Sequence, residues 1–139
     1  MSKLPLTKFE GEILNWLLAG EEPVLNALRR QFTRATVLYK VFTGHGIYIN
    51  FHLPSDVIPL HKEFRVKPRF CFGDVEASIP SLEYGAHFLL WVEDGLLASL
   101  EGFTYDESYP QEISSYQLRY LSEEGRDWNY LRDQWKVTN

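Results

Sequence analysis

The sequence contains only one cysteine, Cys71, so an internal disulfide is excluded. Long apolar runs are also missing: no stretch is long enough to cross a bilayer, and the residues after Met1 lack the apolar segment of a secretory signal. Proteins without disulfides are typical of reducing compartments. We therefore expect a soluble cytoplasmic protein with no membrane association.

The chain also lacks an excess of positive charge. Its 14 Lys and Arg residues are outnumbered by 19 Asp and Glu residues, which gives a formal net charge of −5. A nucleic-acid-binding domain usually carries a broad basic surface, so nucleic acid is not an expected partner. The basic run of Lys62, Arg65, Lys67 and Arg69 is interpreted as a solvated loop face; the alternatives are a site for an acidic partner and pairing with the Asp106-Glu107 loop.

Motifs for metal binding, phosphate binding and nucleophilic catalysis are missing. HExxH, CxxC and G-x-S-x-G do not occur, and the segment Gly44–Gly46 is too short for a phosphate loop. No two histidines have a metal-ligand spacing. The sequence therefore predicts no metal and no cofactor. The histidines are His45, His52, His61 and His87.

Cys71 has two interpretations. It lies between Phe70 and Phe72, and a lone cysteine among aromatic residues is usually a small buried apolar residue. The nearby Lys67 and Arg69 would instead lower the pKa of its thiol and make it reactive. The first interpretation is favoured.

The composition indicates one globular domain over residues 1–139. Hydrophobic residues make up 45% of the chain and charged residues 24%, which is enough apolar surface for a real core. The aromatic share of 15% is high. It supplies large anchors for a core and for an interface.

Two helices are predicted near the N-terminus. Thr7 and Glu10 have the spacing of a capping box, and apolar residues then recur at helical spacing as far as Gly20, a typical stop. Pro23 suits the first turn of a second helix, because its missing amide needs no partner there. The short connection favours a helical hairpin. The predicted helices are Thr7–Ala19 and Pro23–Arg34.

After residue 35 the apolar period changes to two, which is typical of strands. The connection 54–68 contains three prolines and should have little regular structure. We predict an α+β fold, in which the helical hairpin packs on a mainly antiparallel sheet of about six strands, and a short C-terminal helix is compatible with the spacing of Trp128, Leu131 and Trp135. The predicted strands are Thr36–Phe42, Ile47–Leu53, Phe70–Phe72, Val75–Ile79, Phe88–Val92, Leu97–Glu101 and Ile113–Leu121.

The stretch Ala86–Phe103 is predicted to be a central hairpin. Asp94-Gly95 favours a two-residue type I′ turn, which places Trp91 opposite Ala98 and Phe88 opposite Glu101. Trp91 is then expected in the core, against Trp16, Leu17 and Leu28. Strand alternation gives the hairpin a core face, with Leu89, Trp91, Leu96, Ala98 and Leu100, and a second face, with Phe88, Leu90, Val92, Leu97, Ser99, Glu101 and Phe103.

The second hairpin face and the following polar loop form the candidate binding site. Glu101 is its central residue, because a carboxylate among apolar side chains has an unusual environment. It must reach solvent, pair with a cation or remain neutral with a raised pKa. Pairing with Arg119 is the favoured outcome. The candidate residues are Ser99, Glu101, Phe103, Tyr105, Asp106, Glu107 and Tyr109; the plainer interpretation of the loop is a polar turn folded over the sheet edge.

Three segments carry distinctive motifs. They are L-A-G-E-E-P-V-L-N-A-L-R-R-Q (Leu18–Gln31), F-T-G-H-G (Phe42–Gly46), and G-A-H-F-L-L-W-V-E-D-G with L-E-G-F-T-Y-D-E-S-Y-P (Gly85–Pro110). Together they resemble a family of small uncharacterised bacterial proteins, over the middle part of the chain. The resemblance implies a bacterial cytoplasmic origin and a shared fold, and it implies no activity or catalytic residue.

The leading functional hypothesis is a non-enzymatic protein-binding module, such as an immunity-type or accessory protein. It depends on the missing catalytic motifs and on the many aromatic residues, since Tyr, Trp and Arg anchor interfaces. The alternative is a small-molecule binder or enzyme that uses the hairpin face around Glu101. A homodimer that pairs through an exposed strand or the aromatic C-terminus is a third hypothesis.

Overall fold

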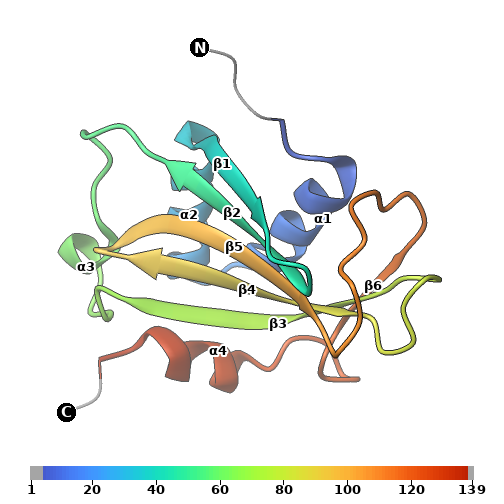
Figure 1. Cartoon of the computed structure of the whole chain (residues 1–139). Coiled ribbons are helices and arrows are strands. Elements are labelled where there is room, and N and C mark those ends of the chain that lie inside the picture. Colours follow the sequence, from blue (N-terminus) through green and yellow to red (C-terminus); the bar gives the residue numbers. More distant parts are fainter. Residues whose placement is uncertain (1–4, 138–139) are drawn as a thin grey trace.

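The N-terminal helical hairpin is present in the computed structural model, which describes residues 5–137 (Figure 1). Helix α1 spans Lys8–Leu17 and helix α2 spans Pro23–Arg34. The capping box is formed, because the Thr7 hydroxyl accepts from the Glu10 amide at 3.1 Å and the Glu10 carboxylate accepts from the Thr7 amide at 2.9 Å. The predicted helices are thus confirmed.

The six strands form one antiparallel sheet in the order β1-β2-β5-β4-β3-β6. The prediction of an α+β fold is confirmed. Two strand predictions differ in detail: the two short strands near Cys71 are one strand with a bulge, and the last strand is shorter than predicted. The strands are β1 (Thr36–Phe42), β2 (Gly46–His52), β3 (Phe70–Ser78), β4 (Ala86–Glu93), β5 (Leu96–Thr104) and β6 (Gln117–Tyr120).

Helices α1 and α2 cover one face of the sheet; they lie behind it in Figure 1. Their apolar stripes bury Ile13, Leu17 and Leu28 completely. Phe9 of α1 packs on Phe88 of β4 with ring centroids 5.6 Å apart. Within the described residues, no helix crosses the face that is turned toward the viewer, so the sheet has a covered face and an open face.

Two further helices lie outside the hairpin. The single turn α3 (Leu60–Glu63) interrupts the long connection before β3, and α4 (Trp128–Trp135) runs beside β3 (Figure 1). The predicted C-terminal helix is therefore present. Trp135 is buried, and its ring centroid lies 5.7 Å from that of Phe72.

The register of the central hairpin corrects the prediction. Asp94 and Gly95 have φ of 53° and 73°, as a type I′ turn requires. Trp91, however, pairs with Ser99 and not with Ala98, because a β-bulge shifts the register between Val92 and Trp91. A bulge places two residues of one strand against one residue of its partner, and Ala98 is the extra residue here.

The bulge also explains why the predicted faces were wrong. Leu97 and Leu100 are both buried although they are three residues apart, because the extra residue resets the alternation of β5. Leu100 pairs with Leu90 on the covered face, and Trp91 therefore lies on the open face. The expected core position of Trp91 is incorrect. The covered face of the hairpin carries Phe88, Leu90, Val92, Leu97 and Leu100.

Candidate binding surface

The open face carries three rows of side chains that cross neighbouring strands. Opposed residues of an antiparallel pair lie on the same face, so the registers define these rows. Several of the aromatic side chains are well exposed, including Tyr39 at 47% and Tyr48 at 38%. The rows are Val41, Tyr48, Glu101 and Leu89; Tyr39, Asn50, Ser99, Trp91 and Cys71; and Phe103, His87, Glu76 and Arg119.

Glu101 lies at the centre of the open face and is held by two aromatic donors. The Tyr48 hydroxyl donates to Glu101 Oε2 at 2.9 Å, and the Trp91 indole Nε1–H donates to Glu101 Oε1 at 3.0 Å. The hydrogen bond to the Glu101 carboxylate is also the main reason why the pKa of Tyr48 is raised. Both aromatic side chains are thus fixed through their polar atoms.

The expected pairing of Glu101 with Arg119 does not form. Arg119 pairs with Glu76 at 2.7 Å, because β6 is bonded to β3 and lies at the far edge of the sheet from Glu101. Arg69, the other nearby cation, pairs with Glu93 at 3.1 Å. Glu101 therefore has no cationic partner within 4.0 Å among residues 5–137.

Cys71 lies on the open face opposite Trp91 and is only partly buried. Burial raises the pKa of its thiol, and the Glu101 carboxylate adds to this effect, whereas Arg69 opposes it. A raised pKa disfavours the thiolate, which is the nucleophilic form. The interpretation of Cys71 as a reactive thiol therefore has no support from its surroundings.

His87 and Tyr105 form a second polar pair on the open face. His87 Nε2 lies 2.8 Å from the Gly73 carbonyl oxygen, and Nδ1 lies 3.3 Å from the Tyr105 hydroxyl. Because a carbonyl can only accept, Nε2 carries the proton, and Nδ1 accepts from Tyr105 when the imidazole is neutral. Burial raises the pKa of Tyr105, so its hydroxyl keeps the proton. The pair fixes the Tyr105 ring beside Phe103.

The predicted loop residues divide into exposed and structural groups. Tyr105 and Asp106 are exposed, and Asp106 has a positive φ of 60° at the tip of the loop. The Glu107 carboxylate accepts from the backbone amides of Glu83 and Tyr84 at 3.0 and 3.2 Å, so it fastens the neighbouring loop. Tyr109 is 7% exposed, and its burial raises the pKa of its hydroxyl. Glu107 and Tyr109 thus shape the loop and do not present a surface.

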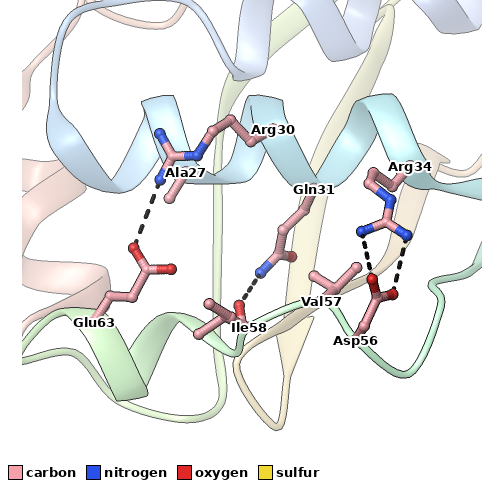
Figure 2. Close-up of a pocket in the computed structure, with 8 residues that line it drawn as sticks. All are labelled: Ala27, Arg30, Gln31, Arg34, Asp56, Val57, Ile58 and Glu63. Carbon is pink, nitrogen blue, oxygen red and sulfur yellow. Dashed lines mark hydrogen bonds and ion pairs between the residues drawn. The ribbon is translucent and has the colours of Figure 1, made fainter.

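A cavity of about 210 Å³ lies between α2 and the connection before α3 (Figure 2). Its two arginines are paired: Arg34 with Asp56 at 3.0 Å and Arg30 with Glu63 at 3.6 Å. The buried Gln31 side chain donates to the Gly95 and Ile58 carbonyls, and its Oε1 accepts from the Leu97 amide at 2.8 Å. The polar groups of this cavity thus hold α2, the connection and the hairpin turn together.

Residues 5–137 contain no group of three His, Cys, Asp or Glu side chains that is arranged to hold a metal ion. Within the same residues, no helix has both the length and the apolar character needed to cross a membrane.

The chain matches no protein-family model, no curated protein and no solved structure. The resemblance to small bacterial proteins therefore stays a prediction.

The structure brings together four of the predicted site residues on or beside the open face: Ser99, Glu101, Phe103 and Tyr105. Sequence reasoning missed the two side chains that hold Glu101. In the sequence of β2, Tyr48 alternates with the apolar residues Ile47, Ile49 and Phe51, and this alternation was a usable signal that Tyr48 faces away from the core. Trp91 was missed because the bulge at Ala98 has no clear sequence signature.

Proposed function

We propose that this protein is a non-enzymatic binding module whose open face docks on a partner protein that presents basic side chains. The observation that carries the proposal is the carboxylate of Glu101, which lies between the exposed Tyr48 and the partly buried Trp91 and has no cation within 4.0 Å among residues 5–137. Tyr and Trp are enriched at the centres of protein interfaces. An immunity-type or accessory role, in which the chain covers its partner, is consistent with the net charge of −5.

The fixed orientation of the aromatic side chains supports this proposal. Tyr48 and Trp91 are fixed by Glu101, and Tyr105 is fixed by His87. Rigid aromatic side chains lose little conformational entropy on binding, so more of their contact energy appears as affinity. A surface of this kind is suited to an interface before its partner arrives.

The alternative of a pocket for a small molecule or an enzyme has less support. That pocket was predicted to be lined by Phe88, Leu90, Leu97 and Phe103, but the first three are buried on the covered face, beneath α1 and α2. Ser99 and Glu101 lie on the opposite side of the sheet from them. The apolar and polar groups of the predicted pocket therefore do not converge.

Site-specific cross-linking tests the proposal. A photo-reactive amino acid replaces Tyr39, which is 47% exposed on the open face, and a matched protein carries it at Ile58, which is 57% exposed on the connection before α3. We expect position 39 to capture one defined protein in the source cell and position 58 not to capture it. Recovery of the same species from both positions, or of no specific species at several salt concentrations, contradicts the proposal.

A homodimer is a second candidate, because β1 is an edge strand with a large apolar surface. Its outer side makes no backbone hydrogen bond to another described segment, and an unpaired edge favours pairing with a second strand. Sedimentation at micromolar concentration tests it, with Val41→Lys expected to give monomers and Ile58→Lys as the control. A monomeric native protein excludes it. The exposed residues of β1 are Leu38, Tyr39, Val41 and Phe42.

A further inference from the structure

We infer that Glu101, Tyr48 and Trp91 form a subsite for a guanidinium group, contributed by an arginine side chain of the partner. The inference rests on the proposed function and names the chemistry of its central contact. A carboxylate has two oxygens with two lone pairs each. Tyr48 occupies one lone pair on Oε2 and Trp91 occupies one on Oε1. Each oxygen thus keeps one lone pair for a further donor.

The two remaining lone pairs favour guanidinium over ammonium. Guanidinium presents two parallel N–H groups in a plane, and this fork matches the two oxygens of a carboxylate. Ammonium is a compact and strongly hydrated charge that gains less from such a pair of acceptors. The exposed ring of Tyr48 beside the carboxylate adds a surface on which a planar cation can lie.

The cations among residues 5–137 do not fill the subsite. Arg69 lies over the Trp91 ring, with its Cζ 5.0 Å from the ring centroid, but its Nε pairs with Glu93. Its position shows that the Trp91 ring accepts a guanidinium. Arg119 is held by Glu76. The charge of Glu101 is therefore left for a group from outside the described chain.

A guanidinium site of the same composition already exists elsewhere in this molecule. Arg126 makes a bidentate pair with Asp74, at 2.9 and 2.7 Å. Its guanidinium also lies over the Tyr120 and Trp128 rings, 4.9 and 5.5 Å from their centroids. One carboxylate, one tyrosine and one tryptophan thus bind an arginine inside this fold. The group around Glu101 has the same three residue types and no arginine in pairing distance.

Titration with small probes tests the subsite. The indole Nε1–H signal of Trp91, assigned with Trp91→Phe, is followed by ¹H–¹⁵N correlation spectra during addition of N-acetyl-arginine amide. N-acetyl-citrulline amide is the control probe, because citrulline has nearly the same shape and no charge. We expect saturable shifts with a Kd on the order of 10 mM for the arginine probe, at least tenfold tighter than for citrulline. Equal shifts with both probes overturn the inference.

Two variants localise the effect. Glu101→Gln should abolish the saturable shift, whereas Glu76→Gln removes a carboxylate of the same face and should leave it unchanged. If Glu101→Gln does not fold, the comparison of arginine with citrulline on the native protein still decides the question. Arginine binding without cross-linking at position 39 retains the subsite and rejects the proposed function. Cross-linking without arginine binding rejects the subsite alone.

Discussion

Two carboxylates of the same sheet, Asp74 and Glu101, have opposite surroundings. Asp74 and its partner Arg126 are 7% and 5% exposed, and the guanidinium also donates to the Ala19 carbonyl at 2.7 Å. Glu101 lies on the open face and accepts only from the neutral donors Tyr48 and Trp91. The charge of Asp74 is neutralised by a cation within the fold. Glu101 has no such cation among the described residues, and each of its oxygens can accept a further hydrogen bond. The difference separates a structural ion pair from a candidate site.

The position of Asp74 explains what its ion pair holds together. It lies at the bulge of β3, and Arg126 lies just before α4, so the pair joins the C-terminal segment to the sheet. The bond to Ala19 adds the turn between α1 and α2. Three of the five guanidinium N–H groups are bonded within the fold, and the Arg126 side chain is only 5% exposed, so a ligand has no access to it. The pair therefore serves the fold, although its composition resembles that of the Glu101 group.

Removing the cation from the buried pair should have the largest effect on stability. Arg126→Met leaves a buried carboxylate uncompensated, and we expect a loss of about 3–5 kcal/mol in the free energy of unfolding, measured with urea. The double variant Asp74→Asn, Arg126→Met buries no charge and should lose less than the single variant. Equal losses in the two proteins would assign the cost to packing and remove the charge from the explanation.

Substitutions of the neighbouring residues Leu90 and Trp91 of β4 should lower the free energy of unfolding by different amounts, because the two side chains lie on opposite faces of the sheet. Leu90 is 0% exposed beneath the helices, and Leu90→Ala should cost about 2–5 kcal/mol through lost burial and a cavity. Trp91→Ala removes one hydrogen bond and the cation–π contact with Arg69 on the open face, and it should cost about 1–2 kcal/mol. The reverse order of costs would contradict the position of Trp91 on the open face.

Local signals in the sequence were sufficient to predict the helices, strands and turns, but not to predict which residues lie on each face of the central hairpin. The capping box of Thr7 and the turn at Asp94-Gly95 act within a few residues, so their pattern is visible in the chain. The bulge at Ala98 depends on how β5 packs between β4 and β2, which is a property of the assembled sheet. Without the extra residue, Ser99 and Glu101 were assigned to the face of Phe88 and Leu90, so the face with Trp91 contained no polar residue and was taken as the core face.

The candidate site could also be predicted only in part, because some of its features are local in the sequence and others depend on the assembled sheet. Glu101 was recognised because a carboxylate in an apolar strand is visible in the sequence. Its partners were not, because pairing with Arg119 required β6 to lie near β5, and the strand order places β4 and β3 between them. Contacts between strands that are distant in the sequence depend on topology, which the apolar pattern does not specify.

The smallest expected effect concerns the proton of Tyr48, and it tests whether Glu101 orders the open face. The folded pKa of Tyr48 is raised, first by the hydrogen bond to Glu101 and then by burial. The protonated hydroxyl is thus favoured in the folded state, so this stabilisation is complete below the unfolded pKa of about 10 and is lost as the pH rises through the folded value.

Glu101→Gln keeps an acceptor oxygen for the Tyr48 hydroxyl but removes the charge, so the pKa of Tyr48 should fall toward its ordinary value. The ¹³Cζ shift of Tyr48, assigned among the eight tyrosines with Tyr48→Phe, reports the titration. Glu76→Gln is the matched control: it should leave Tyr48 unchanged and lower the pKa of Tyr105, which the Glu76 charge helps to raise. An unchanged Tyr48 titration in Glu101→Gln would mean that the carboxylate does not hold this ring, and the open face would lose the ordered centre on which its binding role depends.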